Sequence, residues 1–88
     1  MVVNNRRSEI EIIGEILSLA KEGTKKTRIL YQTNLSYTQL QNYLFYLLKS
    51  NVLTIENNNS VKTYKTTDKG LKIIENIDKI IKELKFSE

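Results

Sequence analysis

The segment from residue 27 to residue 48, TRILYQTNLSYTQLQNYLFYLL, constrains the fold more than any other part of this chain. Its pattern predicts a short helix, a tight polar turn, and a longer helix whose apolar face is rich in leucine. Ser36 and Gln39 have the spacing of a capping box at the start of the longer helix. Leu35 and Leu40 flank the cap as a hydrophobic staple, which fixes the angle at which the chain enters the helix. Two helices held at a set angle by a turn are typical of the helix-turn-helix, whose second helix fits the major groove of DNA.

Cap and stop signals elsewhere in the chain set the boundaries of the other helices. Ser8 and Glu11 form a second capping box, and Gly23 suits a left-handed residue after the first helix. Thr24 is the predicted cap of the short second helix, and Asn51 suits a left-handed exit from the third. The predicted helices cover residues 9–21, 25–32, 37–50 and 67–86.

Two short alternating runs rich in β-branched residues, 52–56 and 61–66, predict the strands of a β-hairpin. The residues between them, 57–60, include three asparagines, which tolerate the positive φ of a hairpin turn. Thr67 and Asp68 then open the last helix. This order predicts a mainly α fold with a small β-hairpin: a winged helix-turn-helix with a C-terminal dimerisation helix. We expect one domain, with residues 1–7 as a flexible N-terminus, 8–66 as the helix-turn-helix and wing, and 67–86 as the last helix.

The last helix carries more large aliphatic residues than one small domain can bury. Part of this apolar surface must cover the hairpin and the first helix. The remainder favours self-association, because residues at a/d heptad spacing run along it. A chain of 88 residues without cysteine also gains limited stability from its own core, which favours a partner subunit. The predicted residues of the dimer interface are Leu71, Ile74, Ile77, Ile81 and Leu84.

The positive charge is concentrated in one region of the chain. Residues 24–65 hold six basic side chains against one carboxylate, a net charge of +5, whereas the whole chain has a net charge of +4. A basic excess confined to one region favours a polyanionic partner. For each single cation the alternative is a solvated surface side chain. The predicted phosphate contacts are Lys25, Lys26 and Arg28 at the start of the second helix, and Lys62 and Lys65 on the wing.

The second helix of the helix-turn-helix presents polar but uncharged side chains, because residues 36–48 contain no charged residue. Thr38, Gln39, Gln41 and Asn42 are its outward polar residues. Glutamine and asparagine can pair with both N6 and N7 of adenine, so these amides are candidate base contacts; the alternative is ordinary exposed amides. Ser36 and Tyr37 more readily cap and brace the helix, although a hydroxyl there can reach a phosphate. Phe45 and Tyr46 also look outward, and the sequence leaves core, dimer surface and groove contact open for them.

Several classes of function are disfavoured by what the sequence lacks. It has no histidine, no cysteine and no glycine-rich loop, so we expect no enzyme, no metal site and no cofactor. No apolar run approaches the ~20 residues of a membrane span, and we expect a soluble cytoplasmic protein associated with the nucleoid.

The chain resembles the archaeal winged-helix DNA-binding proteins of about ten kilodaltons, which dimerise through a C-terminal antiparallel coiled coil. The resemblance rests on TRILYQTNLSY at residues 27–37, on the Tyr-Leu and Leu-Leu pairs at 43–44 and 47–48, and on TTDKG at 66–70. It implies that residues 36–42 face the groove and that the wing meets the backbone of double-stranded DNA. Family members often carry lysine or arginine on this helix, and the last helix of the best-known relatives is longer than the one predicted here.

The expected function is therefore a homodimeric transcriptional regulator that binds double-stranded DNA. A general chromatin protein is the nearer alternative. A protein-interaction module, with Phe45, Tyr46 and the hairpin as its docking surface, is the alternative from another class.

Overall fold

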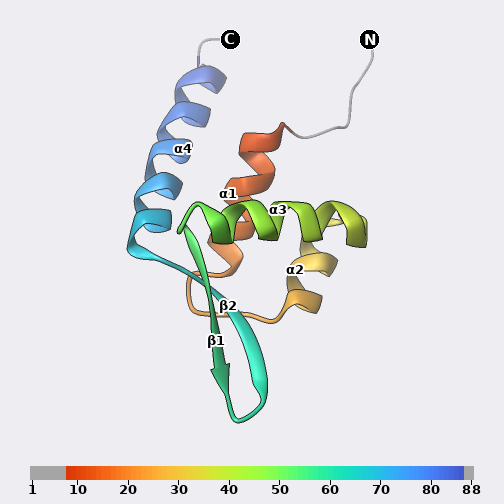
Figure 1. The fold of residues 1–88 in the computed structure, drawn as a ribbon. Helices are drawn as coiled ribbons and strands as arrows, with labels where there is room; N and C mark the ends of the chain where they lie inside the picture. The colour runs from red at the N-terminus through yellow and green to blue at the C-terminus, as the bar shows by residue number, and fades with distance from the viewer. Residues whose placement is uncertain (1–7, 87–88) are drawn as a thin grey trace.

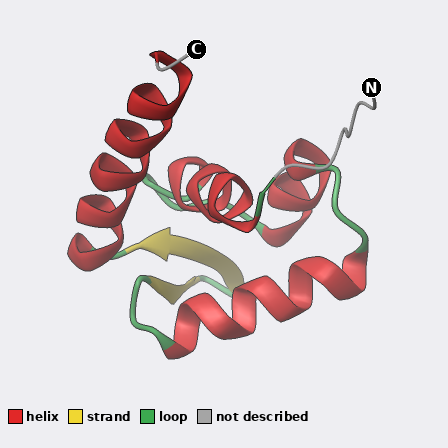
Figure 2. Cartoon of the chain, turned by 90° about the horizontal axis from the view of Figure 1, so that it is seen from above, coloured by secondary structure: helices red, strands yellow, loops and turns green. Residues whose placement is uncertain are grey.

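The computed structural model describes residues 8–86, so the predicted flexible N-terminus, 1–7, lies outside the described residues. Four helices and one hairpin follow each other in the predicted order, which confirms the fold class (Figure 1). The elements are α1 (Glu9–Leu19), α2 (Lys26–Thr33), α3 (Tyr37–Lys49), β1 (Leu53–Asn58), β2 (Val61–Thr66) and α4 (Asp68–Phe86). Seen from above, α3 forms one outer layer of the molecule, and α1 and α2 lie behind it (Figure 2).

Both predicted capping boxes are formed. The Ser8 hydroxyl accepts from the Glu11 N–H at 3.2 Å, and the Glu11 carboxylate accepts from the Ser8 N–H at 3.2 Å. At the start of α3, the Ser36 hydroxyl accepts from the Gln39 N–H at 3.1 Å. These reciprocal bonds satisfy backbone donors that the first turn of a helix leaves without intrahelical partners, and they fix where each helix begins.

The predicted cap of α2 is wrong. Lys25 occupies the cap position of α2 and makes no side-chain capping bond. Thr24 instead forms an isolated antiparallel bridge with Tyr64, in which each residue donates its N–H to the carbonyl of the other, at 2.9 and 2.7 Å. Thr24 is therefore held by β2, and its extended backbone adds a one-residue edge to the hairpin.

The hairpin is longer and its turn tighter than predicted. Strand β1 runs to Asn58, and only Asn59 and Ser60 form the turn, both with positive φ (49° and 68°). Two consecutive left-handed residues match the type I′ turn that suits the twist of a two-residue hairpin. The strands pair in register from Leu53 opposite Thr66 to Asn58 opposite Val61.

Helix α1 ends at Leu19, two residues earlier than predicted, where β2 bonds to its last turn. The Thr66 hydroxyl donates to the Leu17 carbonyl at 2.6 Å, and the Thr66 N–H donates to the Ala20 carbonyl at 2.9 Å. Carbonyl groups near a helix end need partners from outside the helix, and Thr66 supplies them here. The chain then turns at Gly23, whose φ of 91° confirms the predicted left-handed residue.

One hydrophobic core lies where α1, α2, α3 and the root of the hairpin meet. Its side chains come from every element of the fold. The core residues are Ile16, Leu17, Ala20, Ile29, Leu40, Leu44, Leu47, Val52, Leu53, Tyr64 and Ile74. This core fixes α3 by one face and leaves its opposite face on the surface.

A set of hydrogen bonds, here called the α3–α4 junction, ties the end of α3 to the start of α4. Thr67 donates its N–H to the Val52 carbonyl at 3.1 Å and its hydroxyl to the Asn51 carbonyl at 2.7 Å. Lys69 donates from Nζ to the Ser50 carbonyl at 3.0 Å. Asn51 has a φ of 64°, which confirms the predicted left-handed exit from α3. The junction therefore fixes the direction of α4 relative to α3.

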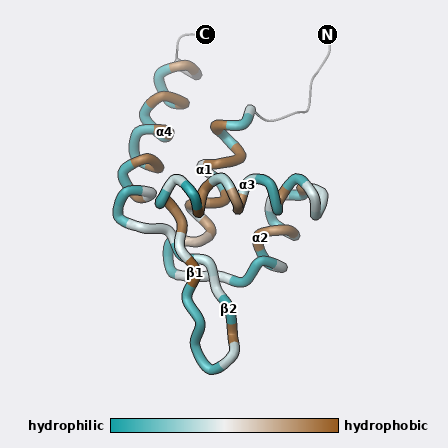
Figure 3. Tube along the Cα trace, in the orientation of Figure 1, coloured by the Kyte–Doolittle hydropathy of each residue, from teal (hydrophilic) through white to brown (hydrophobic). Residues whose placement is uncertain are grey.

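Two residues of the predicted dimer interface are buried within the chain itself. Ile74 and Ile77 are only 4% and 8% exposed, and the Ile77 side chain lies 3.3 Å from the position a Cβ would take on Gly14 of α1. These two isoleucines pack within the same chain, so the proposed interface depends on the more exposed members of the set. Leu71 and Leu84 remain exposed, at 38% and 66%, and Ile81 is half-buried. Figure 3 shows hydrophobic segments along the whole of α4, including its far end.

Candidate nucleic-acid interface

The exposed face of α3 carries one line of side chains, here called the outer stripe. Three leucines form the opposite, buried face: Leu40, Leu44 and Leu47. At 3.6 residues per turn, the positions farthest from these leucines recur at intervals of four, three and four residues. The outer stripe consists of Thr38, Asn42, Phe45 and Lys49, all exposed. In Figure 1, α3 lies across the front of the molecule.

The three amides predicted to contact bases differ in what they already bind. The Gln39 Oε1 accepts from the Ser36 N–H at 3.0 Å, and the Gln41 Oε1 accepts from Lys26 Nζ at 2.5 Å. Each of these oxygens already accepts one hydrogen bond and has one lone pair left, so these two glutamines are partly engaged before any bidentate contact with adenine. The Asn42 amide makes no hydrogen bond within residues 8–86. Asn42 is therefore the amide whose oxygen and NH₂ group are both available for bidentate contact with a base.

Lys26 connects α2 to α3. Its ammonium group lies 5.2 Å from the centroid of the Tyr37 ring and 3.5 Å from the Tyr37 hydroxyl, in addition to its bond to Gln41. A cation over an aromatic face contributes ~0.5–1 kcal/mol at an exposed site. An ammonium group has three donors, so these contacts leave one for another partner. Lys26 thus braces the helix-turn-helix while its charge stays beside α3.

The first turn of α2 collects positive charge. Lys25, Lys26 and Arg28, here called the α2 cation cluster, surround a helix start that no side chain caps. Lys25 and Arg28 are exposed. Free backbone N–H groups and the positive end of the helix dipole add to the side-chain charge, so this turn favours an anion such as phosphate.

The two wing lysines do not lie together. Because side chains alternate along a strand, Lys62 shares a face with Tyr64, and Lys65 lies on the opposite face. Lys62 Nζ sits 5.9 Å from the centroid of the Tyr64 ring, opposite Asn57 and close to the turn. Lys65 is half-buried nearer the root of the hairpin. The hairpin projects beyond the helices, so the part that carries Lys62 is open on both faces (Figure 1).

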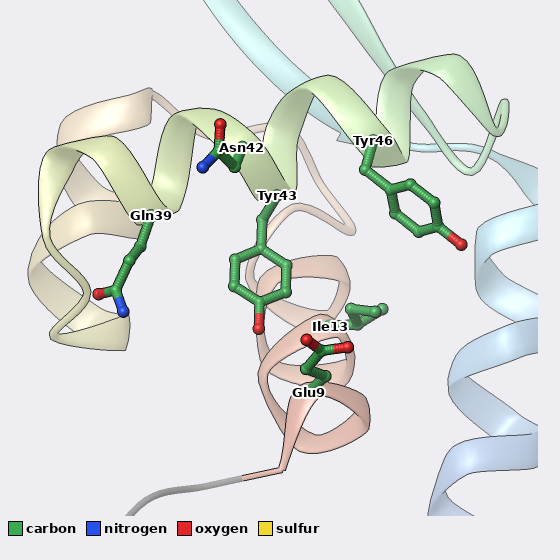
Figure 4. A pocket seen from close by; sticks show the side chains of 6 residues that line it. All are labelled: Glu9, Ile13, Gln39, Asn42, Tyr43 and Tyr46. Carbon is green, nitrogen blue, oxygen red and sulfur yellow. The ribbon is translucent and has the colours of Figure 1, made fainter.

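A depression of about 560 Å³ lies between the start of α1 and the edge of α3 that faces away from the α2 cation cluster (Figure 4). The residues that line it are Glu9, Ile13, Gln39, Asn42, Tyr43 and Tyr46. Sequence reasoning missed this depression, because nothing local indicates that residues 9 and 13 lie beside residues 39–46. Glu9 gives this edge of α3 negative charge, whereas the α2 edge is positive, so a polyanion would approach α3 from the α2 side.

Within residues 8–86, no three acidic, histidine or cysteine side chains are grouped to hold a metal ion. None of the four helices described is long and apolar enough to span a bilayer.

Comparison with known proteins gives a consistent assignment. A family model described as winged helix-turn-helix matches residues 6–85. The uncharacterized protein MJ0290 of Methanocaldococcus jannaschii is 36% identical over 78 residues, which span 88% of this chain and 35% of that protein. The chain thus spans about a third of the length of this curated relative.

Two solved structures share the fold. Sso10a-2, a DNA-binding protein from Sulfolobus solfataricus, is 32% identical with a TM-score of 0.79, and the match covers 90% of this chain and 83% of that chain. MepR from S. aureus, solved with a bound oligodeoxyribonucleotide, is 16% identical with a TM-score of 0.71, and covers 89% of this chain and 59% of that one. The MepR likeness concerns the fold alone. The resemblance to archaeal winged-helix proteins that the sequence indicated is confirmed.

Proposed function

Because the chain belongs to the winged helix-turn-helix family, we propose that it binds double-stranded DNA through α3 and acts as a transcriptional regulator. This is a binding role without a catalytic step. It places the protein with the nucleoid in the cytoplasm, and that location is part of the proposal.

One observation carries the proposal: the uncharged segment of α3, residues 37–48, lies beside a cluster of cations. Residues 24–65 have a net charge of +5, yet residues 36–48 contain no charge. A helix with its side chains is ~10–12 Å across, close to the ~12 Å width of the major groove. Uncharged donors and acceptors suit base edges, whereas cations beside them suit the phosphates that border the groove.

The geometry suggests a role for each candidate residue. Thr38 and Asn42, on the outer stripe, would contact base edges. The α2 cation cluster would hold phosphates, with Ser36 and Tyr37 as nearby hydroxyl contacts. Gln39 and Gln41 would position the helix and offer their NH₂ groups as donors. On the wing, Lys62 is the better phosphate contact because Lys65 is half-buried at the root.

Homodimerisation through α4 is a separate part of the proposal. The exposed aliphatic side chains of α4 are Leu71, Ile80 and Leu84, at 38%, 49% and 66%, and Ile81 is half-buried beside them. A second copy would remove this apolar surface from water. Two winged helices joined in this way would bind two half-sites on one duplex.

Binding to duplex DNA at several salt concentrations tests the proposal directly. Fluorescence anisotropy with a labelled 30-base-pair duplex should give saturable binding that weakens as salt rises. Replacing the whole α2 cation cluster by alanine should lower the slope of log affinity against log salt by about three, because each lost phosphate contact removes ~0.9. The matched control removes the same charge from α4, at the exposed residues Lys72, Lys79 and Lys82.

The outcomes separate the candidate functions. An equal loss of slope in the α4 control would show that the effect is one of net charge and would remove the α2 cation cluster from the interface. No binding of any duplex at tens of micromolar would favour the protein-interaction module, for which the exposed Phe45 and Tyr46 are the supporting observation. Binding without a preference of ~10³-fold or more for a selected sequence over random DNA would favour the chromatin protein.

A further inference from the structure

Phe45 is a large apolar side chain at a position where the fold does not need one. It is 67% exposed on the outer stripe, on the face of α3 opposite the buried leucines. Exposed single aromatics are common on protein surfaces. This one, however, lies between Asn42 and Lys49 on the face that we propose enters the groove.

A cation and an amide flank Phe45 along α3. The Lys49 ammonium group lies 5.7 Å from the centroid of the Phe45 ring, so a cation covers one side of the ring. One turn before it, the Asn42 amide has no hydrogen bond within the described residues. The stripe thus presents an amide, an aromatic ring and a cation in order along α3.

The spacing of this series is similar in size to the spacing of base pairs. Asn42 and Phe45 are three residues apart, a rise of ~4.5 Å along the helix axis. Successive base pairs rise by ~3.4 Å along the duplex. An adenine bound by Asn42 would therefore bring Phe45 to the major-groove edge of an adjacent base pair.

The chemistry of that edge determines what Phe45 can recognise. In the major groove, the C5-methyl group of thymine is the apolar feature among the donors and acceptors of the four base pairs. A phenyl ring placed on a G·C edge would cover polar groups without bonding to them, which costs free energy. Resting on the proposed DNA binding, we infer that Phe45 is a specificity residue that recognises a thymine methyl group beside the adenine bound by Asn42.

The test removes only the methyl group from the DNA. A duplex obtained by in vitro selection with the full chain is resynthesised with deoxyuridine in place of thymine, one position at a time. One substitution next to a selected adenine should weaken binding about fourfold, the factor that corresponds to the ~0.8 kcal/mol of one buried methyl or methylene group. Phe45→Ala should weaken binding to the thymine duplex at least about fourfold and should bind the deoxyuridine duplex no more weakly than the thymine duplex. Phe45→Leu should keep the sensitivity to deoxyuridine.

Matched controls assign the effect to this residue. Tyr31, an 86% exposed aromatic on α2, lies outside the outer stripe, so Tyr31→Ala should keep both affinity and deoxyuridine sensitivity. Circular dichroism checks that each variant folds, which the exposure of both side chains makes the expected result.

The result can overturn this inference without overturning the proposed function. Three results would each refute the role of Phe45 and leave DNA binding intact. They are tight binding that no deoxyuridine weakens, a selected sequence without a thymine in the base pairs next to the adenine, and an unchanged deoxyuridine sensitivity in Phe45→Ala. Failure of the wild-type chain to bind any duplex would refute both.

Discussion

Replacing Gly70 by alanine tests whether the α3–α4 junction is as tightly packed as the structure indicates. Gly70 lies in the first turn of α4 and is buried. A Cβ there would lie 2.3 Å from the Val52 carbonyl oxygen and 2.6 Å from the Thr66 Cγ2. In an open helix, alanine would instead stabilise by ~0.5–1 kcal/mol relative to glycine. The sign of the effect therefore depends on the contact.

The magnitude follows from the overlap. Carbon and carbonyl oxygen approach each other to ~3.3 Å without strain, so α4 must retreat by about 1 Å. Overpacking of this kind costs ~1–3 kcal/mol. The retreat also lengthens the two bonds that Thr67 donates to Val52 and Asn51, each worth ~1 kcal/mol. After subtraction of the helix-propensity gain, we expect a loss of about 2–4 kcal/mol, which lowers the melting temperature by roughly 10–25 °C.

Thermal and urea unfolding, followed by circular dichroism at one protein concentration, measure this loss. Gly14→Ala is the matched control, because a Cβ at Gly14 meets only the Ile77 side chain, at 3.3 and 3.7 Å. That side chain can shift, so Gly14→Ala should stay within about 1 kcal/mol of the wild type. A Gly70→Ala variant that melts at or above the wild type would refute the close approach, as would a control that loses as much stability.

Three further substitutions test other contacts. Ser36→Ala removes the acceptor of the Gln39 N–H and should cost ~1 kcal/mol in urea unfolding; no loss would mean that the cap of α3 is dispensable. Thr66→Val keeps the shape but removes the hydroxyl bonded to the Leu17 carbonyl, so we expect a loss of ~1–2 kcal/mol, and a neutral result would contradict that role. Changing Ile80 and Leu84 together to glutamate should give a folded monomer by light scattering; an intact dimer would move the proposed interface away from α4.

The parts of the fold that the sequence predicts well are those with local signals. A capping box needs residues only three positions apart, so Ser8 with Glu11 and Ser36 with Gln39 are visible in the sequence. Left-handed residues are similarly local, and an asparagine directly after the apolar pattern of α3 indicates the left-handed residue found at Asn51. Helix order and the hairpin follow from the same short-range patterns.

The errors concern partners that are distant in the chain. Thr24 looks like a helix cap, yet its partner is Tyr64, forty residues away. The apolar pattern of α4 identifies Ile74 and Ile77 as buried but cannot say whether α1 of the same chain or a second copy buries them. The close approach of Gly70 to Val52 likewise has no signal in the sequence.

The candidate site shows the same division. Helical spacing predicts that polar side chains of α3 face outward, and residues 38, 39, 41 and 42 are exposed. Spacing alone cannot show that the Gln41 oxygen is bound by Lys26 of another helix. It also leaves open whether Phe45 belongs to the core, to a dimer surface or to the groove, whereas the structure shows that this side chain is 67% exposed.

Three hydrogen bonds of the α3–α4 junction tie the helix proposed to enter the groove to the helix proposed to hold a second copy. In such a pair, the junction and the contact between the two copies of α4 together set the distance between the two copies of α3. One extra base pair between half-sites moves the second half-site by ~3.4 Å and rotates it by about 35° around the duplex. A dimer with this distance held constant would bind half-sites at a single spacing. Its operators would therefore be recognised by the distance between half-sites as well as by their bases.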